Sequence, residues 1–579
     1  MKLWVQNRLS RYPRLERRLR LLVRRLRART GYPDWRGIQR KGITLPPIPE
    51  RRGSPRILIA TSVGSHLPGT SLESVLGAAL ALRGAEPEVL LCDGVLPACL
   101  ACDVTWYPNQ RQFVQHGPSR DLCQACYAPG AGMYHSLGIL VHTYSSQVTP
   151  EESAAATATA ATIPVEDIAG YRVDGLAVGE HALAGTLRFF ARATLETEPH
   201  AEAVLRRYLH AALLTVAATR RLIRNRGYRA VVLHHGIYVP QGLIGEVCRQ
   251  ESVRVVTWNP AYRKHRFVFS HEDTYHHTLM NEPTETWEEL PWTAEMETEL
   301  LDYLRSRWHG AEDWIWFHER PQVEVAAISR EVGVDFSKPT IGMLTNVMWD
   351  AQLHYPANAF PNMLEWTLQT IRYFATRPEL QLLIRAHPAE LRGTLPSRQP
   401  IVEEIRRAFP VLPANVFLVP PESQVSTYSA MSACDAVIIY GTKTGVELTS
   451  VGIPVIVAGE AWIRNKGITL DATSPAQYFS LLDRLPLGHR LDQATVTRAR
   501  KYAYHFFFRR MIPLEFMRPR NGWPPFAVGI ESLAQLLPGA SAGLDLICEG
   551  ILTGSPFIYP EERIKGEPEP ALESRNVHA

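Results

Sequence analysis

The stretch from 435 to 470 constrains the fold of this chain more than any other. It reads DAVIIYGTKTGVELTSVGIPVIVAGEAWIRNKGITL. The pattern predicts an apolar strand at 436–440, a tight turn at 441–445, a short helix from Val446 and a second apolar strand at 455–458. Two buried strands joined by a helix form a βαβ unit, so the chain is expected to contain a parallel sheet.

The turn of this unit predicts a phosphate site. Ligands of such sheets lie beyond the carboxyl ends of the strands, where this turn offers backbone N–H groups at a helix N-terminus. Lys443 adds a cation, and Glu447 is placed to accept hydrogen bonds from ribose hydroxyls. The other residues of the predicted site in this turn are Gly441, Thr442, Thr444 and Gly445. An ordinary capped turn between strand and helix is the alternative.

A second element of the same kind lies about fifty residues upstream. Residues 380–390, LQLLIRAHPAE, predict an apolar strand that ends at Arg385 and is followed by His387 and Pro388. Because Pro388 cannot continue the strand, Arg385 and His387 are expected at a carboxyl end, on the same rim as the Gly/Thr turn. A rigid turn without a ligand is the alternative. The combination of the two elements in one sheet favours a nucleotide site.

These residues also carry a resemblance. RAHPAE, followed by PPESQVSTYSAMSACDAVIIYGTKTGVELTSVGIPVIVAGEA, resembles the nucleotide-sugar half of bacterial capsule-polysaccharide biosynthesis glycosyltransferases. That group includes the Kdo-transferase-like proteins and has the GT-B fold. The resemblance is strongest over about 335–485 and weaker over 55–280. It implies a donor nucleotide held by His387, Ser426, Thr427 and the 441–447 turn.

Length and strand spacing predict the domain organisation. A chain of 579 residues is expected to form two domains with accessory segments. Further apolar strands are predicted at 56–61, 88–92, 229–233, 253–257, 339–344 and 415–419. The predicted fold class is α/β, with two Rossmann-like domains that face each other across a cleft in the GT-B arrangement. The predicted segments are a basic amphipathic helix (1–30), a linker (31–54), an acceptor domain (55–280), interdomain helices (281–335), a nucleotide-sugar domain (336–500), return helices (501–560) and a disordered tail (561–579).

The rim of the acceptor domain offers two histidines as a general base. His235 stands beside Gly236, where a substrate can approach closely, and His66 lies in the loop after the first strand. A histidine whose pKa is near the operating pH can take the proton of an acceptor hydroxyl, and His235 is the preferred candidate. A histidine that only hydrogen-bonds its loop is the alternative. Asp273 and the histidines around it form a weaker candidate.

Four cysteines have the spacing of a zinc site. Cys99 and Cys102 form one CxxC pair, and Cys123 and Cys126 form a second after twenty residues. The eight cysteines of a chain without an export signal do not suggest disulfides. A structural zinc with a closed four-thiolate shell is predicted, in which Cys92 could replace one ligand; free thiols are the alternative. No redox cofactor is predicted, because the first loop lacks GxGxxG.

The first thirty residues are strongly basic. They contain eleven Lys or Arg and one Glu, although the net charge of the whole chain is only +4. Pro13 can begin a helix, whose apolar face would consist of Leu15, Leu19, Leu22, Val23 and Leu26. The segment lacks the apolar core and cleavage site of a signal peptide. It predicts peripheral binding to the anionic, cytoplasmic face of the cell membrane, each cation contributing about 1 kcal/mol. A helix docked on its own protein and a nucleic-acid arm are the alternatives, and the second is disfavoured because no basic aromatic platform occurs elsewhere.

Together these features predict a glycosyltransferase that moves a sugar from a nucleotide-sugar donor to a growing or lipid-linked surface or capsular polysaccharide. Lys443 and the helix N-terminus would stabilise the departing phosphate, so a catalytic metal is not required. Arg464 and Lys466 are also expected to neutralise donor phosphates, unless their loop is merely solvated. The alternatives are a CDP-alditol-type phosphotransferase, a sugar-nucleotide epimerase of the same fold and a non-catalytic polysaccharide-assembly protein.

Overall fold

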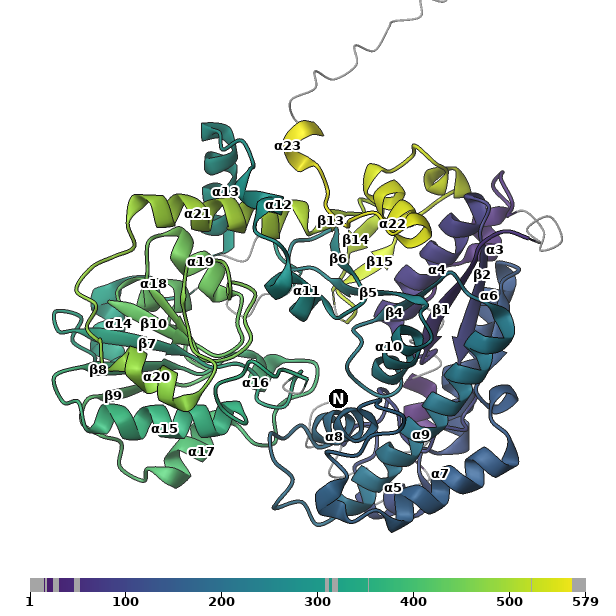
Figure 1. Cartoon of the computed structure of the whole chain (residues 1–579), viewed down its shortest axis with the longest axis horizontal. Helices are drawn as coiled ribbons and strands as arrows, with labels where there is room; N and C mark the ends of the chain where they lie inside the picture. The colour runs from purple at the N-terminus through teal and green to yellow at the C-terminus, as the bar shows by residue number, and fades with distance from the viewer. Residues whose placement is uncertain are drawn as a thin grey trace, which may run out of the picture.

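Two mainly parallel sheets organise the computed structural model of this chain into two lobes (Figure 1). The structure describes residues 15, 18–23, 26, 31–45, 53–307, 312–314, 321–351, 354–521 and 523–564. Most of the predicted basic helix and the predicted tail beyond 564 lie outside the described residues.

The first lobe is built on a seven-stranded sheet. Its strands are β1 (Arg56–Ser62), β2 (Glu86–Leu91), β3 (Leu140–Thr143), β4 (Ala230–His234), β5 (Arg254–Pro260), β6 (Arg266–His271) and β13 (Ile512–Pro513). The order is β13-β6-β5-β4-β1-β2-β3. The five strands from β5 to β3 are parallel, whereas β6 and β13 pair antiparallel. This is the 3-2-1-4-5 order of a Rossmann sheet, and its direction of winding changes between β1 and β4.

The second lobe has a six-stranded sheet in which every neighbouring pair is parallel. Its strands are β7 (Thr340–Leu344), β8 (Gln381–Arg385), β9 (Val416–Val419), β10 (Ala436–Ile439), β11 (Val455–Val457) and β12 (Leu470–Asp471). The order β12-β11-β10-β7-β8-β9 is the complete Rossmann order. The loops after β7 and β10 therefore meet where the winding reverses. The predicted α/β class with parallel sheets is confirmed.

Helices cover both faces of each sheet, as continuously buried parallel strands require. The first lobe contains α3 (Trp35–Gln39), α4 (Leu67–Leu82), α5 (Gln110–His116), α6 (Arg120–Ser136), α7 (Pro150–Thr162), α8 (Val178–Phe190), α9 (Ala201–Arg226), α10 (Gln241–Gln250) and α11 (Tyr275–Asn281). The connection contains α12 (Glu285–Glu288), α13 (Ala294–Arg307) and α14 (Val325–Val332). The second lobe contains α15 (Met363–Ala375), α16 (Ala389–Arg392), α17 (Ile401–Ala408), α18 (Thr427–Ser432), α19 (Thr444–Ser450), α20 (Pro475–Leu482) and α21 (Gln493–Tyr504).

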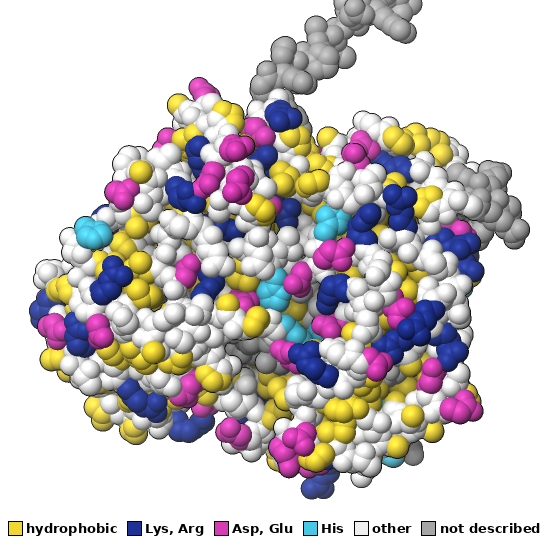
Figure 2. Space-filling model, viewed as in Figure 1, with side chains coloured by type: hydrophobic (Ala, Val, Ile, Leu, Met, Phe, Trp, Pro, Cys, Tyr) yellow, Lys and Arg dark blue, Asp and Glu magenta, His cyan; other side chains and the backbone are white. Residues whose placement is uncertain are grey.

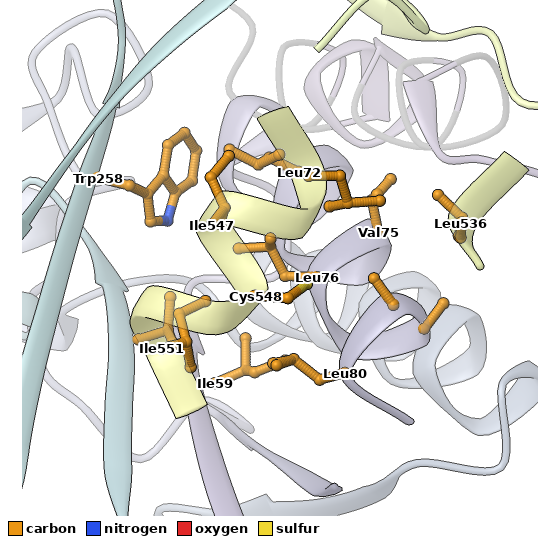
Figure 3. Close-up of a cluster of buried hydrophobic side chains, with 14 of the residues drawn as sticks. Ile59, Leu72, Val75, Leu76, Leu80, Trp258, Leu536, Ile547, Cys548 and Ile551 are labelled. Carbon is orange, nitrogen blue, oxygen red and sulfur yellow. The ribbon is translucent and has the colours of Figure 1, made fainter. Parts of the chain in front are cut away.

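After α21 the chain returns to the first lobe. It adds β13 to the edge of the first sheet, forms the hairpin β14 (Met517–Pro519) and β15 (Phe526–Val528), and continues into α22 (Ala542–Thr553) and α23 (Glu561–Ile564). Figure 3 shows Ile547, Cys548 and Ile551 of α22 beside Leu76 of α4 and Ile59 of β1. Helix α22 is thus part of the hydrophobic core of the first lobe.

Two predicted unstructured segments are folded where the structure describes them. The predicted linker 31–54 contains α3, whose Trp35 is 1% exposed and packs in the core of the first lobe. The predicted disordered tail begins with α23, in which Glu561 forms an ion pair of 3.1 Å with Arg266. Both segments are folded for the same reason. Each has a polar local composition, but residues far away in the sequence bury part of it.

Glu73 of α4 makes the stability of the first lobe pH-dependent. Its side chain is buried and its Oε1 accepts a hydrogen bond from Trp258 Nε1 at 3.0 Å. Burial raises its pKa from 4.5 to about 7, although Thr61 and Trp258 act in the opposite direction. Because the folded-state pKa lies above the unfolded value, the folded protein binds more protons between these pH values, and stability is lost as the pH rises.

Replacing Glu73 with Gln keeps an oxygen for Trp258 and removes the charge. The substitution is expected to raise the free energy of unfolding by about 3 kcal/mol at pH 8 and by about 1 kcal/mol at pH 5. Urea denaturation at the two pH values measures this, with the exposed Glu549→Gln as the control. A gain of the same size at both pH values would contradict the expectation.

Candidate functional site

A cavity of about 590 Å³ lies between the carboxyl ends of the two sheets. Figure 2 shows histidine side chains gathered in the hollow between the lobes. All of the predicted catalytic and nucleotide-binding residues except Gly445 and Glu447 line this cavity. They are His66, His235, Arg385, His387, Ser426, Thr427, Gly441, Thr442, Lys443 and Thr444.

The Gly/Thr turn after β10 is fixed from the neighbouring strand. Asn346, in the loop after β7, donates from Nδ2 to the carbonyl oxygen of Gly441 at 2.9 Å. The hydroxyls of Thr442 and Thr444 lie 3.3 Å apart at the start of α19, which begins at Thr444, two residues before the predicted start. The turn therefore presents two hydroxyls and the Lys443 ammonium at the cavity wall.

Lys443 belongs to a buried charge network. Its Nζ lies 2.8 Å from Glu447 Oε1 and 4.8 Å from the centre of the Tyr262 ring of the first lobe. Glu447 is 5% exposed and also pairs with Arg307 Nε at 3.2 Å. Although burial alone would raise it, Arg307 and Lys443 lower the pKa of Glu447. Glu447 thus holds two cations in place instead of facing the cavity, where a ribose hydroxyl would have to lie.

Gly445 also has a packing role. A Cβ at this position would lie 2.7 Å from Cδ1 of Ile439 and 3.1 Å from Cγ2 of Ile463. Glycine therefore permits α19 to approach β10 closely, which brings the start of the helix to the cavity.

Arg385 builds the opposite wall of the same half. It is 2% exposed and donates to the carbonyl oxygens of Pro420 and Ser423, and to Thr427 Oγ1 at 3.4 Å. Burial, followed by the charge of Arg392, lowers its pKa to about 10, so it keeps its charge at neutral pH. Ser426 is the N-cap of α18. These contacts hold the 420–427 segment at the cavity.

His387 presents a defined tautomer. Its Nδ1 accepts a hydrogen bond from the backbone N–H of Ala389 at 3.0 Å, so the neutral ring carries its proton on Nε2. A neutral histidine of this tautomer is a hydrogen-bond donor, suited to a phosphate or ribose oxygen.

The wall of the first lobe contains three neighbouring histidines. The ring centres of His66 and His234 lie 4.7 Å apart, and those of His234 and His235 lie 5.7 Å apart. Burial lowers the pKa of each, that of His66 to about 3, and the charge of Arg188 acts in the same direction. All three imidazoles are therefore neutral at neutral pH and able to accept a proton.

His235 has two features of a functional residue. Its φ of 65° lies in the left-handed region, which is unusual for a residue other than glycine. Its Nδ1 is buried and has no hydrogen-bond partner among the described residues. Asp350 of the second lobe accepts a hydrogen bond from Tyr238 OH at 2.7 Å, and its charge raises the pKa of His235 against the effect of burial.

The weaker base candidate around Asp273 is an ionic contact between the lobes. His277 Nδ1 lies 3.0 Å from Asp273 and its Nε2 lies 3.2 Å from Glu460 of the second lobe. Although burial acts to lower it, the two carboxylates raise the pKa of His277 to about 10. His277 is thus protonated at neutral pH and cannot act as the base, whereas burial lowers the pKa of His276, which lines the cavity.

The expectation for Arg464 and Lys466 is wrong. Both are buried away from the cavity. Arg464 donates to the carbonyl oxygens of Gly459 and Ala472 at 2.9 and 2.8 Å. Lys466 donates to those of Met280 and Glu282 at 2.9 and 3.1 Å. The two side chains thus satisfy buried backbone carbonyl groups inside the fold and do not face a donor phosphate.

The predicted zinc site is not supported. The predicted ligands Cys99, Cys102, Cys123 and Cys126, together with Cys92, do line one small cavity. However, no group of three or more His, Cys, Asp or Glu within the described segments is arranged to hold a metal ion. Cys126 Sγ accepts a hydrogen bond from Ser65 N at 3.1 Å, and burial raises the pKa of Cys102 well above its usual value. These thiols pack the loop that carries His66.

Three polar residues that line the cavity are not predicted from the sequence. Arg188 lies inside α8, Gln241 begins α10 and Asn259 lies near the end of β5. None belongs to a recognisable motif. Only the position of Asn259 at a strand end is a signal that could have identified it.

No protein-family model matches the chain, and no curated protein sequence matches it. Among solved structures it is similar to the β-Kdo 2,4 transferase KpsC of Thermosulfurimonas dismutans, with 11% identity and a TM-score of 0.33 over 48% of this chain and 80% of that chain. It is also similar to S. aureus MnaA in a structure with UDP (9% identity, TM-score 0.25, 78% of this chain and 92% of that chain). A third similar structure is Anabaena HepE in complex with UDP-glucose, with 12% identity and a TM-score of 0.24 over 78% of this chain and 93% of that chain. At these TM-scores, the fold of this chain is assigned from its own strand orders.

Proposed function

We propose that this chain is a GT-B-type glycosyltransferase that moves a sugar from a nucleotide-sugar donor to a surface or capsular polysaccharide acceptor. The observation that carries the proposal is the chemical division of one cavity between two lobes. The second lobe contributes cations, hydroxyls and a histidine donor, whereas the first contributes neutral histidines beside Arg188. A group transfer needs these two halves to face each other.

In the second lobe, the donor nucleotide would contact His387, Arg385, Ser426, Thr427 and the 441–444 turn. Lys443 would stabilise the charge that develops on the departing phosphate, and Glu447 and Tyr262 would hold its ammonium in position. These groups supply the stabilisation without requiring a catalytic metal.

In the first lobe, His235 would take the proton of the acceptor hydroxyl, and His66 is the second candidate. The acceptor hydroxyl would attack the anomeric carbon of the donor, the bond to the nucleotide phosphate would break, and the proton would pass to His235. Asp350 reaches this region from the second lobe, and its negative charge would favour the protonated His235 that the transfer forms.

The test is a thermal-shift measurement of the full chain with CMP, CDP, UDP and GDP. At 100 times its Kd, the cognate nucleotide is expected to stabilise the protein by about 2.7 kcal/mol. The matching nucleotide sugars are then incubated with and without a glycan acceptor. Nucleotide release that depends on the acceptor supports a transferase, and conversion of the nucleotide sugar alone supports an epimerase. If no nucleotide stabilises the protein, the donor site is rejected and the non-catalytic alternative is favoured.

We also propose that the basic N-terminal segment binds an anionic membrane surface. Its described residues are helical, and Leu15, Leu22, Val23 and Leu26 are 39–52% exposed. Arg20 contacts the carbonyl oxygen of Thr105, so the segment is attached to the first lobe while these apolar side chains face solvent. Within the described part of the chain, no helix is long and apolar enough to cross a bilayer.

Replacing Leu22 and Val23 together with Gln is expected to weaken binding to anionic vesicles about tenfold or more, because each large apolar side chain contributes about 1.5–3 kcal/mol when fully buried. Co-sedimentation with phosphatidylserine-containing and neutral vesicles measures this. Leu391→Gln, at an exposed position of the second lobe, is the matched control. Equal binding to both vesicle types would reject the anionic surface as the partner.

A further inference from the structure

Two buried amide side chains line the cavity, and each has a polar atom without a hydrogen-bond partner, although the side chain of Asn259 also bonds to that of His234. Gln241 and Asn259 are 2% and 6% exposed. Gln241 Oε1 and Asn259 Nδ2 are buried atoms without a hydrogen-bond partner in the described part of the chain, as is Nδ1 of the neighbouring His234. All three line the first-lobe half of the cavity. An unsatisfied buried polar group destabilises the fold, so a polar ligand that hydrogen-bonds to these atoms is favoured.

Arg188 adds a positive charge to the same half. Its Nη1 donates to the carbonyl oxygen of Leu100 at 2.7 Å, and its Cζ lies 5.5 Å from the centre of the Tyr238 ring. No described carboxylate lies within ion-pair distance of it. In contrast, two other cations of the cavity, Lys443 and Arg307, pair with buried carboxylates. The histidines beside Arg188 are neutral, so they neither balance nor share its charge.

A second cavity, of about 130 Å³, adjoins the first at Arg188. Arg188 and His66 line both cavities, and Trp106 and Tyr32 contribute to the smaller one. The carboxylate of that wall, Asp103, already accepts hydrogen bonds from the backbone N–H groups of Thr105 and Trp106 at 2.8 and 3.1 Å. Arg188 therefore lies at the junction of the two cavities, and no described carboxylate, Asp103 included, forms an ion pair with it.

We propose that the first-lobe half of the cavity binds a saccharide that carries a negative charge, a carboxylate or a phosphate. The anion pairs with Arg188, and hydroxyl groups of the sugar bond to Gln241, Asn259 and His234. The assignment of this saccharide as the acceptor rests on the proposed function. The binding itself does not, because it follows from the unsatisfied groups and the cation alone.

Isothermal titration of the full chain with three probes tests the inference. Glucuronic acid carries a carboxylate, glucose 6-phosphate carries a phosphate, and glucose carries no charge. One of the two anionic sugars is expected to bind the wild-type protein at least tenfold more tightly than glucose, and which one binds identifies the anion. Arg188→Met is expected to reduce its affinity at least tenfold, and Arg188→Lys less. Arg484→Met, which removes an exposed arginine of the second lobe, is expected to change nothing.

Two further measurements separate the possible failures. Asn259→Ala is expected to weaken binding of the anionic sugar. Binding of inorganic phosphate, which offers no sugar hydroxyls, should not change in this variant. If inorganic phosphate binds as tightly as the sugar, the saccharide assignment is overturned.

The nucleotide thermal shift of Arg188→Met should equal that of the wild type, which shows that the variant is folded. Unchanged anion binding in this variant would overturn the inference and leave the donor site untouched. Arg188-dependent binding in a protein that no nucleotide stabilises would support the inference and reject the proposed transfer.

Discussion

Replacing His387 with Ala is expected to remove between about half and nine-tenths of the thermal stabilisation that the cognate nucleotide gives the wild-type protein. His387 is held by the N–H of Ala389 in the tautomer that donates from Nε2, and it follows the β8 strand end at the cavity wall. A charge-assisted hydrogen bond to phosphate contributes about 1.5–3 kcal/mol. Its loss would weaken nucleotide binding roughly 10- to 150-fold, which leaves only about 0.3–1.4 kcal/mol of the about 2.7 kcal/mol expected at 100 times the wild-type Kd.

Two variants distinguish a lost ligand contact from a damaged loop. His387→Asn retains an oxygen that can accept from the N–H two residues later, so it should melt like the wild type without ligand and still bind nucleotide weakly. His489→Ala removes an exposed histidine of the same lobe and should bind as the wild type does. An undiminished nucleotide shift in His387→Ala would show that the nucleotide lies elsewhere.

The second lobe was the more predictable part of the chain. Its strands are short apolar runs that end at Pro, Gly or polar residues, and such runs in parallel sheets are recognisable because they are buried on both faces. The 436–440 and 380–385 runs therefore gave correct strands, and their carboxyl ends gave residues that line the cavity. Local sequence suffices where a residue is placed by the strand that precedes it.

The outcome differs for charged residues, because their roles depend on distant partners. Glu447, Arg464 and Lys466 follow the turn in sequence and have suitable charges. Nevertheless Glu447 pairs with Arg307, and Lys466 donates to carbonyl oxygens near residue 280. Arg188 could not be predicted for the same reason, since only the packing of α8 brings it to the cavity. The orientation of a buried charged side chain depends on the partner that compensates its charge. The spacing of residues along the sequence does not identify that partner.

The cysteines show a similar distinction. Spacing correctly indicated that the two CxxC pairs lie together, because both line one cavity. Ligation requires more than proximity: the sulfurs must be deprotonated and must converge on one point. Among the described residues no three such ligands converge in this way; Cys126 accepts a hydrogen bond from Ser65 N, so the cluster packs against the loop of His66.

Replacing His235 with Asn is expected to lower the turnover of acceptor-dependent transfer about 100- to 10,000-fold, the usual contribution of a general base. Asn is the appropriate replacement, because it tolerates the left-handed backbone that His235 adopts. The nucleotide thermal shift should be unchanged, since His235 lies on the first lobe. His116→Asn, at an exposed position of that lobe, is the matched control.

The pH dependence of transfer tests the same assignment independently. Burial lowers the pKa of His235 below 6.5, so the base is neutral at pH 7 and the acid limb of the pH–rate profile should lie below pH 6.5. Asp350→Asn removes the carboxylate that raises this pKa, and it should therefore shift the limb to still lower pH. If His235 only supports its loop, the acid limb of the pH–rate profile should lie at the same pH in Asp350→Asn as in the wild type. If His235→Asn turns over at the wild-type rate, His66 becomes the base, and its pKa of about 3 predicts a rate that is flat down to pH 4.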